Sequence, residues 1–332
     1  MPLIKHSSYV PPRFLKNPHI QTIYPFVARP VLGVNYRRER IQTPDGDFLD
    51  LDWSYASSKR LAILSHGLEG HSRHSYMLGM VKALNNEGIS ALSWNLRGCG
   101  GEVNVKEHFY HGGMTEDLQA VIESVYPYFD EIYLIGFSLG GNITLKYLGE
   151  LGDKVPPKVC CAVNFSVPID LKACSYVVND EKNWVYFKKF MHSIRSKVNA
   201  KSARVNFSVP IELLKKASSF KDLDDWFTAP LFGFNNAEHL WEEISSKKYV
   251  EKIRIPTLLV SSEDDPILAA ECYPTELARQ SDYVYFEMPS HGGHVGFVAL
   301  NWANEYWSES RAVEFIEEHR GTRGVKPGMT MI

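Results

Sequence analysis

The chain has 332 residues, of which 44% are hydrophobic and 23% are charged, as in a soluble globular protein with a sizeable core. Its formal net charge of −3 at pH 7 gives no general reason to expect a nucleic-acid partner. The five cysteines show no C-x-x-C spacing, which argues against a disulfide framework. The N-terminus has no apolar core of signal-peptide length and no later run approaches a membrane span, so we expect a cytoplasmic protein.

The first residues of the chain are rich in proline. Residues 1–33 contain five prolines beyond the start and little periodicity, and we expect them to wrap over the domain as an irregular arm. Two strands are predicted next, at 36–43 and 47–55. They are joined at 44–46, where proline presets φ and glycine supplies a positive φ.

Short apolar runs and helical patterns then alternate along the chain. Further strands are predicted at 61–65, 89–95, 132–136, 158–165, 255–262 and 283–288. Helices are predicted at 75–86, from 115 onward, at 139–151, 268–279 and 308–319. We expect a flexible connection at 97–101. Because strands and helices alternate, the sequence predicts an α/β fold with a mostly parallel, doubly wound sheet, and one domain over residues 1–332.

One interval is too long for this alternation. About ninety residues separate Phe165 from Ile255, far more than one crossover helix needs. We interpret 168–250 as a mainly helical insertion that caps the strand ends. Within 187–198, apolar residues recur at helical spacing among basic ones, which favours a lid helix that packs its apolar side on the domain. A basic amphipathic helix in peripheral contact with lipid is the alternative interpretation.

The stretch after the strand at 132–136 has the pattern of a nucleophile elbow. Gly136-x-Ser138-x-Gly140 would place a serine on a sharp turn between a strand and a helix, where its hydroxyl is exposed. Glycine on either side lets the neighbouring backbone approach closely. The N-terminus of the following helix points N–H groups at charge that develops there. The sequence therefore predicts Ser138 as a nucleophile.

A serine nucleophile needs a base and a group that orients the base. In an α/β hydrolase the chain order is serine, acid, histidine, with acid and base after successive strands. Asp265 follows one late strand, with Asp264 as the minority candidate, although Asp265 before a proline would also make a good helix N-cap. His294 follows the next strand after two glycines, and His291 is the runner-up.

The stretch 66–70 (HGLEG), directly after a buried strand, is expected to supply the remaining part of the site, which binds the oxyanion. An oxyanion needs two backbone N–H donors aimed at one point. We expect one donor from Leu139, which follows the nucleophile, and the other from Leu68. A metal site is also suggested by three histidines that lie close in sequence, His66, His71 and His74. No second cluster of ligands has suitable spacing, which argues against such a site.

Taken together, these residues resemble the α/β-hydrolase superfamily, and more narrowly its YheT-like branch of esterases. The motifs that carry the resemblance are HIQT at 19–22, HGLEG at 66–70, RGC at 97–99, TEDL at 115–118, GFSLGGN at 136–142, DDWFTAP at 224–230, GF at 233–234, DDP at 264–266 and GGH at 292–294. Gly100 departs from the serine expected in many relatives. Membrane-attached relatives have an N-terminal apolar span, which this sequence does not contain.

The resemblance implies Ser138 as nucleophile, Asp265 as orienting acid and His294 as base of a carboxylic-ester hydrolase. It also implies a small or lipid-like ester as substrate, including acylglycerols. A serine, histidine and aspartate scheme requires no metal or organic cofactor, and we expect none. An acyltransferase or thioesterase on the same fold, or a catalytically silent binding protein, are the alternatives.

Overall fold

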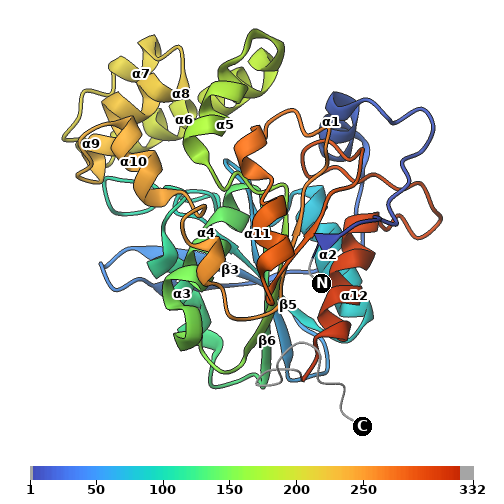
Figure 1. Cartoon of the computed structure of the whole chain (residues 1–332). Helices are drawn as coiled ribbons and strands as arrows, with labels where there is room; N and C mark the ends of the chain where they lie inside the picture. Colours follow the sequence, from blue (N-terminus) through green and yellow to red (C-terminus); the bar gives the residue numbers. More distant parts are fainter. Residues whose placement is uncertain (1–2, 322–332) are drawn as a thin grey trace.

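A sheet of nine strands runs through the part of the molecule that the computed structural model describes, residues 3–321 (Figure 1). Its strands are β1 (Leu3–Ile4), β2 (Arg37–Gln42), β3 (Phe48–Ser54), β4 (Arg60–Ser65), β5 (Ser90–Asn95), β6 (Glu131–Phe137), β7 (Val159–Phe165), β8 (Thr257–Val260) and β9 (Val284–Glu287). They are ordered β1-β9-β8-β7-β6-β4-β5-β3-β2. Only β3 pairs antiparallel with its neighbours β2 and β5, so the predicted mostly parallel sheet is confirmed.

The burial of each strand follows from its place in the sheet. Every residue of β5 and β7 is buried, as expected for parallel strands covered on both faces. By contrast, β2 is an edge strand that is mostly exposed and rich in arginine. Charged side chains on an exposed edge discourage pairing with another sheet.

Helices cover both faces of this sheet. They are α1 (Pro18–Ala28), α2 (Ser75–Asn86), α3 (Thr115–Val125), α4 (Leu139–Leu151), α11 (Thr275–Gln280) and α12 (Trp307–Glu318). Apolar residues of α2 and α12 join one half of the core, and those of α3 and α4 join the other half. The helices α2 and α4 span the predicted residues.

The long interval between β7 and β8 is helical, and Figure 1 shows its helices gathered on one side of the sheet. They are α5 (Leu171–Asn179), α6 (Trp184–Ser202), α7 (Leu213–Lys216), α8 (Phe220–Leu223), α9 (Ala229–Leu231) and α10 (Ala237–Ile244), with a π-helical turn at Asp224–Thr228. Short 3-10 turns occupy Gly152–Lys154, Glu181–Asn183, Val250–Lys252 and Ala270–Cys272. We refer to α5–α10 as the cap.

Two predictions about helices are wrong. Residues 18–28 of the supposedly irregular arm form α1, because Asn17 accepts the backbone N–H groups of His19 and Ile20 and Pro18 occupies the first helical position. The helix predicted at 268–279 is reduced to α11, since Pro274 has no N–H with which to continue a helix from the preceding turn.

The connection after β5 is tied to the core rather than loose. Arg97 is buried and pairs with Asp117 in the first turn of α3, at 2.6 Å, and with Asp45 of the β2–β3 turn, also at 2.6 Å. Burial raises the pKa of Asp117, although the Arg97 guanidinium opposes this. Within residues 3–321, no helix is long and apolar enough to cross a membrane.

Candidate active site

Ser138 lies on a strained turn between β6 and α4. Its backbone has φ 51° and ψ −120°, which is unusual for a residue other than glycine. The turn requires its glycines: a Cβ on Gly140 would come within 2.2 Å of the Ser65 carbonyl oxygen, and one on Gly136 within 2.4 Å of the Gly141 Cα. The sequence pattern therefore has the backbone geometry of an elbow that exposes the serine hydroxyl.

The structure brings together the three side chains predicted for catalysis. His294 Nε2 lies 2.8 Å from Ser138 Oγ, and His294 Nδ1 lies 2.9 Å from Asp265 Oδ2. The Asp265 carboxylate is completely buried and the imidazole is nearly so. Because the carboxylate accepts from Nδ1, Nε2 is free to accept the hydroxyl proton.

The two minority candidates contact each other instead. Asp264 Oδ2 lies 3.2 Å from His291 Nδ1, and Asp264 Oδ1 accepts the N–H of Gly293 at 3.0 Å. Asp265 also accepts the N–H groups of Ile267 and Leu268, as its capping role predicts, but no α-helix begins there. The geometry thus places Asp265, the acid that the sequence favours, against His294, and Asp264 against His291.

The inner face of α1 holds the loop that carries His294. The Thr22 hydroxyl accepts the His294 N–H at 2.9 Å, and Gln21 Oε1 accepts the Val298 N–H at 2.9 Å. Both side chains are buried. Sequence reasoning missed this role, although Asn17 followed by Pro18 is a helix-start signal and would have placed two polar residues on one helical turn.

The loop after β4 passes directly beside the nucleophile. A Cβ on Gly67 would lie 3.1 Å from Ser138 Cβ. Among the hydrogen bonds of residues 3–321, none uses the backbone N–H of Leu68 or of Leu139, the first residue of α4. Both N–H groups therefore remain available to an oxyanion.

Glu69 connects the loop after β4 to the cap. It has a positive φ of 56°, its N–H donates to the Tyr110 hydroxyl, and that hydroxyl donates to Glu69 Oε1 at 2.8 Å. From α6, Lys197 pairs with Glu69 Oε1 at 2.6 Å and the Ser193 hydroxyl donates to Glu69 Oε2. The sequence offered no signal for this contact, which joins residues more than a hundred positions apart.

The histidines considered as metal ligands are not arranged as a metal site. His66 Nε2 accepts the Leu96 N–H at 3.1 Å, so Nδ1 carries the proton and donates to the Gly67 carbonyl at 2.8 Å. Burial lowers the pKa of His66 to about 3, which keeps it neutral. In the part of the chain that the structure describes, no group of three or more His, Cys, Asp or Glu could hold a metal ion.

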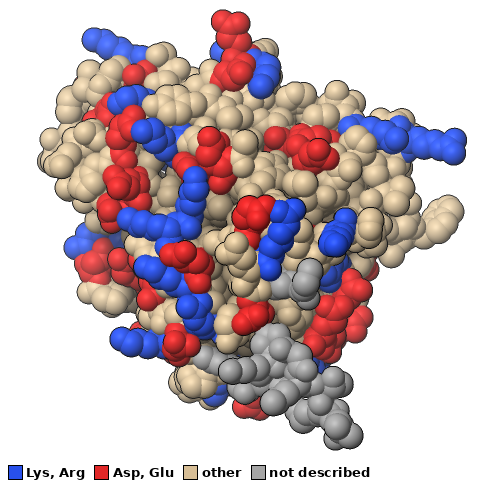
Figure 2. Space-filling model, in the orientation of Figure 1, with Lys and Arg blue, Asp and Glu red and all other residues tan. Residues whose placement is uncertain are grey.

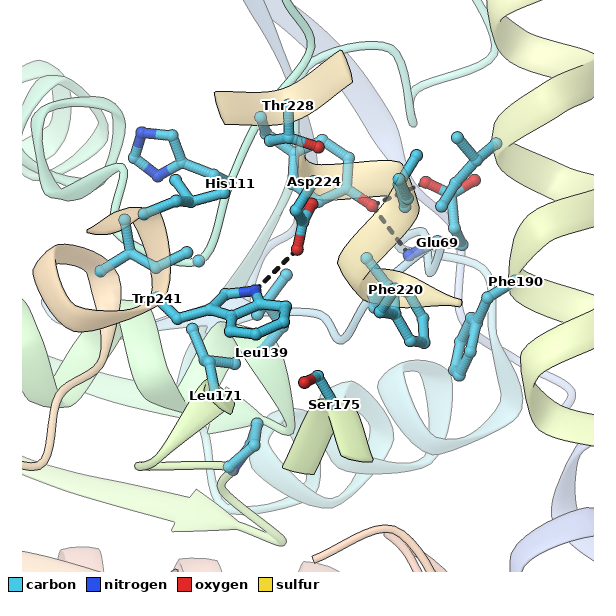
Figure 3. Close-up of a pocket in the computed structure, with 18 of the residues that line it drawn as sticks. Glu69, His111, Leu139, Leu171, Ser175, Phe190, Phe220, Asp224, Thr228 and Trp241 are labelled. Atoms are coloured by element: carbon cyan, nitrogen blue, oxygen red, sulfur yellow. Dashed lines mark hydrogen bonds between the residues drawn. The ribbon is translucent and has the colours of Figure 1, made fainter. Parts of the chain in front are cut away.

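A cavity of about 180 Å³ opens beside Ser138 and His294 and extends under the cap. Most of its lining is apolar, and Figure 3 shows Phe190 and Phe220 side by side in its wall. Asp224, in the same wall, accepts the indole N–H of Trp241 at 2.7 Å (Figure 3), and burial raises the pKa of this carboxyl to about 6. Such a pocket suits a largely apolar group with few polar contacts.

Comparison with known proteins agrees with this architecture. The sequence profile of a family described as serine aminopeptidase, S33 matches residues 56–221. The YheT protein of Escherichia coli is 31% identical over 321 residues, which cover 93% of each chain. A monoacylglycerol lipase of Saccharomyces cerevisiae is 28% identical over 96% of this chain and 72% of its own. The human phospholipase ABHD3 is 31% identical over 82% of this chain and 69% of its own.

Among solved structures, an esterase of Pyrococcus furiosus superposes with a TM-score of 0.60 at 19% identity, covering 96% of this chain and all of that one. At this identity the likeness concerns the fold alone. The sheet, the elbow and the cap define an α/β-hydrolase architecture, as predicted. The chain belongs to the α/β-hydrolase superfamily and, within it, to the YheT-like branch.

Proposed function

We propose that this chain is a serine hydrolase that cleaves carboxylic esters through an acyl-enzyme. The observation that carries the proposal is the continuous contact from Asp265 through His294 to Ser138, at 2.9 and 2.8 Å. These distances are those of a base that can take a proton from its nucleophile while a carboxylate holds it in place. The names of the relatives, a lipase and a phospholipase, support ester hydrolysis.

In the first step, Ser138 Oγ attacks the ester carbonyl carbon and its proton passes to His294 Nε2. The negative oxygen that forms accepts the N–H groups of Leu68 and Leu139, and each such donor is typically worth about 3 kcal/mol. The carbon–oxygen bond then breaks, the alcohol leaves with the proton from His294, and the acyl group stays on Ser138.

In the second step, water attacks the acyl-enzyme while His294 takes its proton. The serine–acyl bond breaks, Ser138 recovers the proton and the carboxylic acid leaves. Asp265 stabilises the imidazolium in both steps without itself becoming protonated. The scheme uses no metal or organic cofactor.

The shape of the cavity supports a lipid-like acyl group as part of the substrate. Aromatic and aliphatic residues of the cap form most of its walls, so an acyl chain would leave water without losing hydrogen bonds. Acylglycerols and related lipid esters are therefore the substrates that we expect. The names of the yeast and human relatives support this class.

The proposal is tested with a panel of aryl esters of increasing acyl length. Ser138→Ala should abolish hydrolysis and labelling by a fluorophosphonate, with unchanged circular dichroism. Product analysis with added alcohol separates hydrolysis from acyl transfer. Full activity of the Ser138→Ala protein would refute the assignment, and so would its continued labelling at an unchanged rate.

A further inference from the structure

The helix α1 has its polarity inverted relative to an ordinary surface helix. Its buried positions are Gln21, Thr22 and Pro25, two of which hold the His294 loop. Its outward positions are apolar and exposed: Ile20, Ile23, Phe26 and Val27, the last at 77%. An amphipathic helix in a water-soluble surface normally places these kinds of residue the other way round. The outer face of α1 is therefore only partly covered: Phe26 packs edge-on against His74 and Tyr76, and the apolar side chains of this face stay exposed.

Neighbouring segments extend this apolar face. The side chains that we call the α1 surface are Val10, Phe14, Ile20, Ile23, Phe26, Val27, Leu32, Trp184, Val185, Leu300 and Trp302, and all are exposed. Contacts show that the segments adjoin: His19 Nδ1 lies 2.9 Å from the Tyr186 hydroxyl, and Asn304 Nδ2 donates to the Pro30 carbonyl at 2.7 Å. Figure 1 shows α1 beside the loop that follows β9. Apolar patches of this kind mark interaction sites.

Four cations lie in or beside the segments that form the α1 surface, where Asp180, Glu181 and Glu305 are the flanking carboxylates. Residues 1–38 contain six Lys or Arg and no Asp or Glu, and two of these cations, Arg29 and Arg38, pair with Glu309 and Asp52 of other segments. Arg13 and Lys16 precede α1, and Lys188 and Lys189 lie on α6, where Lys189 Nζ sits 4.7 Å from the ring centre of Phe26. All four are exposed, and within residues 3–321 none of them forms an ion pair with a carboxylate. In Figure 2 basic side chains project from a largely uncharged surface in the region of α1.

We propose that the α1 surface docks on a lipid surface with anionic headgroups, with α1 lying in the plane of the interface. Exposed aromatic and aliphatic side chains would enter the boundary between headgroups and acyl chains, while the cations meet lipid phosphates. The exposed apolar side chains protrude from four separate segments, which favours contact with a fluid lipid surface over a single acidic protein partner. This inference does not depend on the proposed reaction.

The position of the α1 surface relates it to the cavity. The helix α6 begins with Trp184 and Val185 in this surface, and two turns later its Phe190 and Ile194 line the cavity. The opposite face of α1 holds the His294 loop. Docking through α1 would thus bring the lipid phase next to the helix that bounds the pocket. The proposed lipid contact therefore involves α1 as well as the start of α6, which is the part of the cap for which the sequence left lipid contact as an alternative.

The test is co-sedimentation of the full chain with phosphatidylcholine vesicles, with and without phosphatidylglycerol. The wild type should bind the anionic vesicles, and Ile23→Ser/Phe26→Ser/Trp302→Ser should lower the partition coefficient by at least about tenfold. Arg13→Glu/Lys16→Glu should remove the preference for phosphatidylglycerol, since each cation contributes roughly fivefold near an anionic surface. High salt should have the same effect as the charge variant.

A matched control is Val105→Ser/Tyr128→Ser, which removes exposed apolar side chains outside the α1 surface and should bind as the wild type does. Hydrolysis of a soluble short-chain ester should stay unchanged in every one of these variants. Three results would overturn the proposal: no vesicle binding by the wild type, equal binding by the triple serine variant, or a dimer that this variant dissolves. The last result would make the α1 surface a contact between copies of the chain.

Discussion

The contact between α1 and the histidine loop leads to a specific prediction about Thr22. The Thr22 hydroxyl accepts the backbone N–H of His294 at 2.9 Å and donates to the Pro18 carbonyl at 2.7 Å. Replacement by valine keeps the shape of the side chain and replaces the hydroxyl with a methyl group. The buried N–H of His294 then has no acceptor, because valine offers none.

The cost follows from the burial of that N–H. A buried donor left without a partner costs about 1–3 kcal/mol. If the loop shifts so that this N–H finds another acceptor, the distance between Ser138 Oγ and His294 Nε2 changes. A rise of about 1–3 kcal/mol in the activation free energy would then lower kcat by roughly 5- to 150-fold. We expect KM for a soluble ester to change little, because Thr22 lies behind the loop and does not line the cavity.

The assay is steady-state hydrolysis of a short-chain aryl ester across a pH series, beside thermal unfolding of the same proteins. Thr22→Ser is the matched control, since it retains the hydroxyl and should keep kcat within a few-fold of the wild type. Suppose instead that Thr22→Val unfolds at a lower temperature yet keeps the wild-type kcat. The contact would then be purely structural, and the argument that α1 positions His294 would be wrong.

Three other substitutions test separate parts of the molecule. Asp265→Asn should lower kcat by a factor on the order of 10³–10⁴, whereas Asp264→Asn should cost far less; similar losses would contradict the separation of the two carboxylates. Asp224 has a folded pKa of about 6 against an ordinary 3.8, so its charge destabilises the fold as pH rises from about 4 to 6, by on the order of 2–3 kcal/mol. Urea unfolding should therefore show Asp224→Asn gaining stability relative to the wild type over that range, and a pH-independent difference would refute this. Arg97→Met leaves the buried Asp117 carboxylate unpaired and should cost about 3–5 kcal/mol in urea unfolding, with much of the loss recovered by adding Asp117→Leu.

Much of the fold follows from short-range patterns in the sequence. The helices α2 and α4 and the buried strands around them lie at the predicted residues, because apolar periodicity, glycine turns and first-turn acids are local signals. The two errors about helices have local causes as well. The Asn17–Pro18 start of α1 was a readable signal, and Pro274 was a readable interruption of the helix expected before it.

The sequence by itself determined the order of the chemical groups: a glycine-flanked serine after one strand, an acid and a histidine after two later strands, and a glycine loop before them. Only the tertiary structure decided which aspartate faces His294, that Thr22 holds its loop, and that Glu69 ties the neighbouring loop to α6. The physical reason is the range of the interactions. Turns and helices depend on residues a few positions apart, whereas these contacts join side chains that only the folded sheet and cap bring within hydrogen-bond distance.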